Sequence, residues 1–154
     1  MTTVEMRLEL VHVPVSDVDR ARDFYVDKCG WHLLTDHVQM NDMRIVQICP
    51  PGSGCAILLG RHIPEISDMP VGVQKGLHLV VADMEQATKD LTGRGVELGE
   101  VQDLGGCLYC RFEDPDGNSW LLQQWPESGF PHEEPADALA ASPSAPAQRV
   151  PAIR

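Results

Sequence analysis

The chain is poor in basic residues and has no long apolar run. It holds 12 Lys and Arg against 23 Asp and Glu, a formal net charge of -11 over 154 residues. A surface of this sign repels phosphate backbones and anionic headgroups, so neither nucleic acid nor a membrane is expected as a partner. The first residues lack a basic segment followed by an apolar stretch and a cleavage site, and no run is long enough to span a bilayer. The sequence therefore predicts a cytoplasmic protein.

The cysteines do not form an even set of the kind found in disulfide-rich secreted domains. There are five, and without a predicted export signal they are expected to be reduced thiols. Cys107 and Cys110 have the C-x-x-C spacing of zinc and redox motifs. The alternating stretch 107–112 predicts a strand, however, in which residues three apart point to opposite faces. The two sulfurs are therefore predicted to be buried and structural, without a shared metal.

Hydrophobic patterning predicts the order βαβββ for residues 7–60. The strand at 7–15 places Leu8, Leu10 and His12 on one face. A helix is predicted over 17–29, with Ser16 as its N-cap and Gly30 as its stop signal. Three extended segments follow at 31–38, 44–49 and 55–60.

The same order is predicted again after a linker at 61–75. A strand at 77–81 leads to a helix capped by Asp83, and extended segments follow at 96–101, 107–112 and 118–124. Alignment of 15–18 with 81–84 indicates an internal duplication. We expect one α+β domain over residues 1–125, built from two tandem βαβββ modules (7–60 and 76–125) whose curved sheets face each other around a central cavity. Residues 126–154 are rich in Pro, Ala and Ser and are predicted to be a mostly disordered tail, the alternative being a strap over a cleft or a partner subunit.

Three features together resemble one known family. These are the stretch VPVSDVDRA at 13–21 leading to Phe24-Tyr25, the duplicated βαβββ order, and the turn DPDGN at 114–118. They are similar to the vicinal oxygen chelate superfamily of glyoxalases, bleomycin resistance proteins and dioxygenases, and the likeness covers residues 7–124. It implies a cavity for a small organic molecule, and a homodimer is expected because many such duplicated proteins pair and a partner commonly covers exposed sheet edges.

The resemblance also implies four metal-ligand positions, which can be checked in this chain. Metalloenzymes of the family carry His, Glu or Gln on the first and last strand of each module. Here those positions hold Leu10, Gly76 and Leu121, and the fourth falls within 55–60, where no such donor occurs. No divalent metal and no other cofactor is therefore expected. A displaced metal is the alternative, because His12, His78 and Gln123 each lie two residues beyond a lost ligand position.

The candidate site residues are of two kinds. His12 and His78 are candidates for hydrogen bonding or acid-base catalysis, with satisfied core histidines as the alternative. The remaining candidates for ligand binding comprise apolar Leu8, Leu10 and Leu121 and polar Gln47, Tyr109, Arg111 and Gln123.

Two functions follow from this set. The first is a protein that binds a small organic molecule or antibiotic in a largely apolar cavity. The alternative is an enzyme of isomerase, lyase or dioxygenase type, in which His12 or His78 acts as an acid-base group or a displaced metal takes part. The residues name neither ligand nor substrate.

Overall fold

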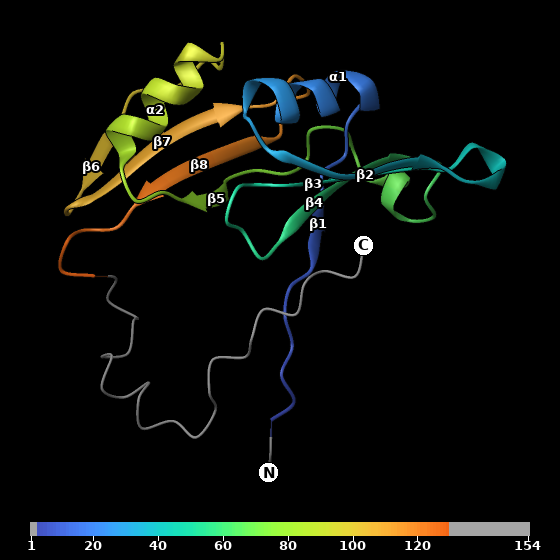
Figure 1. Cartoon of the computed structure of the whole chain (residues 1–154), viewed down its shortest axis with the longest axis horizontal. Helices are drawn as coiled ribbons and strands as arrows, with labels where there is room; N and C mark the ends of the chain where they lie inside the picture. The colour runs from blue at the N-terminus through green and yellow to red at the C-terminus, as the bar shows by residue number, and fades with distance from the viewer. Residues whose placement is uncertain (1–2, 130–154) are drawn as a thin grey trace.

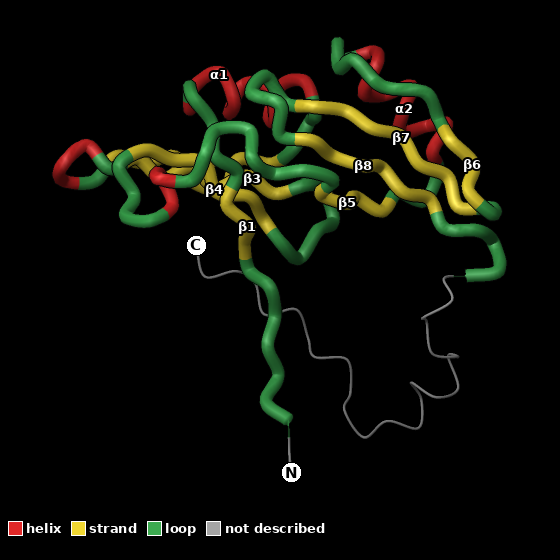
Figure 2. The backbone as a smooth tube through the Cα atoms, turned by 180° about the vertical axis from the view of Figure 1, so that it is seen from behind, coloured by secondary structure: helices red, strands yellow, loops and turns green. Residues whose placement is uncertain are grey.

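Two four-stranded sheets lie side by side, with both α-helices on one common side of them (Figures 1 and 2). The computed structural model describes residues 3–129. The first sheet has the order β1-β4-β3-β2 and the second the order β5-β8-β7-β6. In both, the first strand of the module pairs in parallel with the last, and the other pairs are antiparallel. This repeated topology confirms the α+β fold of two tandem modules. Most of the predicted tail, residues 130–154, lies outside the described part.

The first module follows the predicted order. Its α1 packs on β3 and β4 and continues directly into a π-helical turn, which together confirm the predicted helix. The elements are β1 (Leu10–His12), α1 (Val18–Asp23), the π-helical η1 (Phe24–Lys28), β2 (His32–Val38), the short helix η2 (Met40–Asp42), β3 (Arg44–Cys49) and β4 (Ala56–Arg61).

Strand β1 is shorter than the predicted strand at 7–15. Its partner β4 begins at Ala56, which lies opposite Leu10. The last bond of the ladder runs from the Ala56 amide to the Glu9 carbonyl at 2.9 Å. Residues 3–8 therefore have no neighbouring strand among residues 3–129 to pair with, and they project from the body of the molecule (Figures 1 and 2).

The start of the first helix corrects one prediction. Asp17, not Ser16, is the N-cap, and its carboxylate accepts a hydrogen bond from the Arg20 amide at 3.1 Å. Ser16 instead donates its hydroxyl to Asp116 of the second module at 2.5 Å. The Ser16 side chain, which local spacing predicts to cap the helix, therefore bonds to a residue that is distant in the sequence.

The second module begins after a linker that contains the short helix η3 (Ile66–Asp68). Asp83 is confirmed as the cap of its helix, since the carboxylate accepts from the Gln86 amide at 3.1 Å. The elements are β5 (Leu77–Val80), α2 (Met84–Gly93), β6 (Gln102–Leu104), β7 (Cys107–Glu113) and β8 (Ser119–Gln124).

The predicted strand at 96–101 is wrong. After a turn at Gly95, where φ is +92°, the chain buries Val96 in the core with 4% exposure. One bond, from the Gly99 amide to the Arg111 carbonyl at 2.8 Å, joins this segment to β7. The ladder begins only at Gln102, opposite Tyr109. Because this segment packs beneath α2, strand β6 begins at a later residue than the alternation of side chains predicts.

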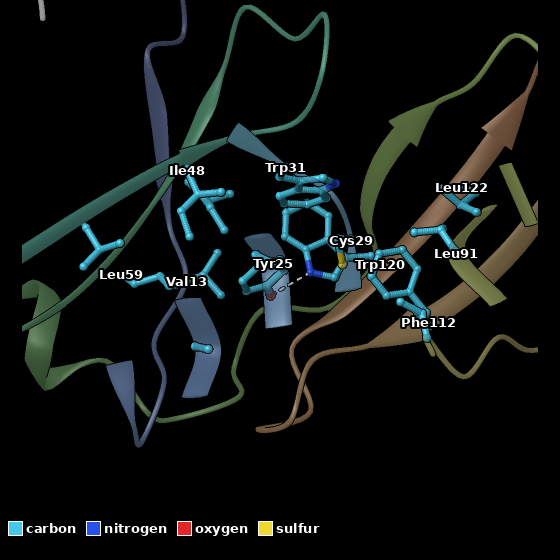
Figure 3. Close-up of a cluster of buried hydrophobic side chains, with 14 of the residues drawn as sticks. Val13, Tyr25, Cys29, Trp31, Ile48, Leu59, Leu91, Phe112, Trp120 and Leu122 are labelled. Carbon is cyan, nitrogen blue, oxygen red and sulfur yellow. Dashed lines mark hydrogen bonds between the residues drawn. The ribbon is translucent and has the colours of Figure 1, made fainter. Parts of the chain in front are cut away.

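A shared core joins the two modules through aromatic side chains (Figure 3). The Tyr25 ring is fully buried, stacks on Trp31 with 5.0 Å between ring centroids, and meets Trp120 edge to face. Its hydroxyl donates to the Asp114 carboxylate at 2.8 Å and accepts from the Trp120 indole at 2.9 Å. Burial, reinforced by the charge of Asp114, raises the pKa of Tyr25 well above its usual value. The phenol therefore stays protonated and keeps its role as a donor.

The DPDGN turn links the two modules by hydrogen bonds. Asn118 is fully buried, and its side-chain amide donates to the Pro14 carbonyl at 2.9 Å and to Asp114 at 2.8 Å. The bond from Ser16 to Asp116 adds a further link. The two sequence motifs that support the resemblance thus contact each other. No helix within residues 3–129 is long and apolar enough to cross a membrane.

Candidate functional site

Each sheet has one face packed on the core, on the side of α1 and α2, and an opposite face without an α-helix, which we call the open face. Side chains alternate between the faces of a strand, so the core residues identify the opposite set. In the first sheet Val46, Ile48, Ile57 and Leu59 belong to the core. In the second sheet the same holds for Leu77, Leu79, Cys110, Phe112, Trp120 and Leu122.

Most of the predicted site residues consequently lie on the open faces. Gly76 adjoins them, immediately before β5. Leu8 is not brought together with them, because it lies in the projecting segment and is 69% exposed. The open faces carry Leu10, His12 and Gln47 in the first sheet and His78, Tyr109, Arg111, Leu121 and Gln123 in the second.

A row of three side chains crosses the open face of the first sheet. Leu58 on β4 is paired with His12 on one side and with Gln47 on the other. Leu58 is 6% exposed. The Nδ1 atom of His12 is buried and has no hydrogen-bond partner among the described residues. We call His12, Leu58 and Gln47 the first row.

The second sheet repeats this arrangement. Leu121 on β8 is paired with His78 on β5 and with Arg111 on β7. We call His78, Leu121 and Arg111 the second row. The Arg111 guanidinium forms an ion pair with Glu113 on the same strand and remains largely exposed. Both rows therefore consist of a histidine, a leucine and a second polar side chain, at equivalent positions of the duplicated fold.

A polar cluster adjoins the second row, formed by His78, Cys107, Tyr109 and Gln123. The side-chain nitrogen of Gln123 lies 3.3 Å from the Tyr109 hydroxyl and 3.5 Å from the Cys107 sulfur. The rings of His78 and Tyr109 meet edge to face, with centroids 6.5 Å apart. The hydrogen bond with Cys107, together with desolvation, raises the pKa of Tyr109. This phenol is therefore a neutral hydroxyl near neutral pH.

The two cysteines of the C-x-x-C sequence lie on opposite faces of β7. Cys107 joins the polar cluster on the open face. Cys110 belongs to the core, where its thiol donates to the Gly99 carbonyl at 3.3 Å and burial raises its pKa. The spacing alone suggested a metal or redox pair, and the strand geometry separates the sulfurs as predicted.

A cavity of about 220 Å³ borders the first row where the linker passes over the ends of β1 and β4. Its walls include Leu58 from the row and Ile66, Met69 and Val71 from the linker. Sequence reasoning gave these linker residues no role, and it missed Cys107 as a neighbour of Tyr109. The spacing of two between Cys107 and Tyr109 was the signal for a shared face.

Comparison with known proteins matches this architecture to one family. The family model described as the Glyoxalase/Bleomycin resistance protein/Dioxygenase superfamily matches residues 7–122. The chain belongs to this superfamily. An uncharacterized protein of Shewanella frigidimarina is 36% identical over 131 residues, which cover 77% of this chain and 95% of the relative.

Solved structures of the superfamily agree. TnmS3, an antibiotic binding protein from Streptomyces sp. CB03234, is 32% identical to this chain, and the two structures superpose with a TM-score of 0.69. The match covers 80% of this chain and 98% of the TnmS3 chain. A superfamily member from Sphaerobacter thermophilus is 30% identical with a TM-score of 0.67, covering 78% and 98%.

The strand pairing identifies the fourth of the superfamily's metal-ligand positions in this chain. Leu121 is paired with His78, and the equivalent residue paired with His12 is Leu58. The four positions thus hold Leu10, Leu58, Gly76 and Leu121. None has a donor atom in its side chain, so these residues do not fit a divalent metal. Within residues 3–129, no three His, Cys, Asp or Glu side chains are grouped so that they could hold a metal ion.

Proposed function

We propose that this protein binds a small organic molecule on its open faces, without a divalent metal. The observation that carries the proposal is the repeated row, which sets a leucine between a histidine and a second polar side chain on the open face of each sheet. Apolar surface with a few polar groups that fix orientation is typical of small-molecule sites. The likeness to the antibiotic binding protein TnmS3 supports an antibiotic or a similar organic molecule as the ligand class.

The ligand proposal is tested with a neutral fluorescent dye, Nile red, as the probe. Leu121→Glu and Leu10→His should each weaken binding, because a leucine side chain that the ligand covers contributes up to about 1.5–3 kcal/mol on transfer from water and a polar replacement adds a desolvation cost. His32→Ala is the control, since His32 is exposed at the start of β2. Unchanged affinity in both leucine variants would mean that the dye binds elsewhere and that the open faces are not the site.

The metal-free proposal is tested by elemental analysis of the purified protein. We expect far less than one divalent metal ion per chain, because the four ligand positions hold no donors. Near one zinc, iron, nickel or manganese ion per chain, lost on mutation of His12 or His78, would contradict it. Native mass spectrometry of the same sample would reveal an organic ligand that is retained through purification.

An enzyme is the second candidate, and one contact favours it. The Nδ1 atom of His78 lies 2.7 Å from the Gly76 carbonyl, which leaves Nε2 to accept a proton. If a compound is converted, His78→Ala should lower the rate by about 10² to 10⁴ with little change in affinity. In a binding protein the same variant changes affinity alone.

We also propose a homodimer in which a second copy packs on the projecting segment of residues 3–8 and covers an exposed sheet edge. The projecting segment supports this, because Val4, Met6 and Leu8 share one side of it and are 75%, 85% and 69% exposed. Light scattering should give twice the chain mass. Met6→Gln combined with Leu8→Gln should weaken the dimer, whereas Glu5→Gln with Arg7→Gln, on the other side of the segment, should not. The monomer mass at all concentrations would exclude the dimer.

The cytoplasm remains the proposed location. The five cysteines all fall within residues 3–129, and no disulfide joins them. Reduced thiols of this kind suit a reducing compartment.

A further inference from the structure

The hydrogen-bond partner of His78 determines which of its ring nitrogens carries the hydrogen. Nδ1 lies 2.7 Å from the carbonyl oxygen of Gly76. A carbonyl oxygen can only accept, so Nδ1 must be the donor. A neutral imidazole has one N–H, and the other nitrogen then holds a lone pair. In the neutral ring Nε2 of His78 is therefore a hydrogen-bond acceptor.

The neighbouring Gln123 amide uses its hydrogens within the cluster. The Gln123 amide nitrogen contacts both the Tyr109 hydroxyl and the Cys107 sulfur. The Tyr109 hydroxyl thus accepts a hydrogen bond from Gln123. The edge-to-face contact with Tyr109 supports the His78 ring in its orientation. This contact and the bond to the Gly76 carbonyl together hold the acceptor of His78 in place for a molecule on the open face.

The ring that carries this acceptor lies on the open face. A Cβ atom built on Gly76 would meet nothing within 4 Å, and His78 itself is exposed. Leu121, the next residue of the second row, supplies apolar surface beside the ring. The net charge of -11 disfavours an anionic ligand.

We propose that the ligand of this site is an uncharged molecule with a hydroxyl or amine hydrogen that it donates to Nε2 of His78. The inference rests on the proposed binding function and specifies the chemistry that the open face selects. A phenol or an alcohol fits it, and the matching ether does not, because the ether has no hydrogen to give.

The test compares three probes of one ring system: 2-naphthol, 2-methoxynaphthalene and 2-naphthoate. Binding is followed by NMR titration of the full chain at pH 8, above the range in which imidazoles generally titrate. We expect 2-naphthol to bind about three- to tenfold more tightly than the ether, the range expected for one hydrogen bond. The naphthoate should bind most weakly. Ring nitrogen signals of His78 should respond to 2-naphthol and not to the ether.

Two variants assign the discrimination to the residue. His78→Phe keeps a ring but no acceptor and should bring 2-naphthol and the ether to equal affinity. His78→Gln retains an acceptor of similar reach and should preserve part of the difference. His32→Phe is the matched control on an exposed strand position and should change nothing.

The failures of the two proposals are distinguishable. Equal binding of 2-naphthol and the ether by the natural chain, tighter binding of the ether or the naphthoate, or discrimination that persists in His78→Phe would overturn this inference and leave the binding function standing. No binding of any probe would count against the binding function itself, and the inference would fall with it.

Discussion

The two rows occupy equivalent places in a duplicated fold, yet their surroundings differ. In the first row Leu58 is 6% exposed, and the linker walls a cavity beside it. In the second row Leu121 is only half-buried and His78 is exposed. The first histidine has a buried Nδ1 without a described partner, whereas the second is anchored by the Gly76 carbonyl.

The two modules therefore differ in the side chains that they present on their open faces. The first open face offers mainly apolar contact, from Leu10 and Leu58 around His12. The second face carries the polar cluster that can orient a ligand. Duplication supplied the same backbone positions twice, and the residues placed there differ in burial and polarity between the halves.

The largest expected effect concerns the two central leucines. Leu58→Ala should lower the free energy of unfolding by about 2–4 kcal/mol, because it empties a buried site. Leu121→Ala should cost only about 1 kcal/mol, since that side chain is half-exposed. Urea denaturation of both variants measures the difference. Equal losses would show that the second row is as buried in solution as the first, and the comparison would fail.

The helix-side ion pairs of the two modules differ too. Asp36 on β2 accepts hydrogen bonds from Arg44 at 2.9 and 3.0 Å and from Arg22 of α1 at 2.9 Å, so it ties helix to sheet. In the second module the ion pairs of α2 are local: Lys89 pairs with Glu85 within the helix, and Arg94, its C-cap, pairs with Asp90.

Acid should therefore weaken the first module's ion pairs. The hydrogen bond from Arg44, with help from Arg22, lowers the pKa of Asp36 from 3.8 to about 2. A lowered carboxyl pKa stabilises the fold above the unfolded-state value, and that contribution is lost as pH falls from about 4 towards 2. Asp36→Asn should cost about 1 kcal/mol at pH 7, because the pair is partly exposed, and progressively less below pH 4.

Urea midpoints across that pH range provide the measurement. Asp27→Asn is the control, because the Asp27 side chain makes no ion pair with another described residue. An Asp36→Asn deficit that stays constant down to pH 2 would rule out the ion pair as its cause.

The smallest expected effect makes the rows more alike. Arg111→Gln gives the second row the side chain that Gln47 gives the first. The exposed pair with Glu113 contributes little, so stability should change by less than about 0.5 kcal/mol. Binding of 2-naphthol should not change either, since His78 makes the proposed contact. A clear loss of affinity in calorimetry would assign ligand recognition to Arg111 instead.

Much of the candidate site followed from alternation along strands. Two-residue spacing predicted that Leu10 shares a face with His12 and that Leu121 shares one with Gln123, and the core residues on the opposite faces agree. For Gln47, Tyr109 and Arg111 the sequence does not predict whether the side chain faces the site. Alternation along a strand does not say which of its two faces the helices cover. The packing of the helices settled that choice.

Local chemistry in the sequence determined the order of the elements and the Asp83 cap, because these depend on residues within a few positions of each other. The duplication was visible as well, because the same local pattern occurs twice along the chain. Tertiary structure decided where β1 and β6 begin, since a strand extends only as far as its neighbour does. It decided the partner of Ser16 and the place of Leu58 in the first row, because both depend on residues that are distant in the chain. The polar cluster arose the same way: Cys107 and Tyr109 meet Gln123 only through the pairing of β7 with β8, and His78 joins them through β5.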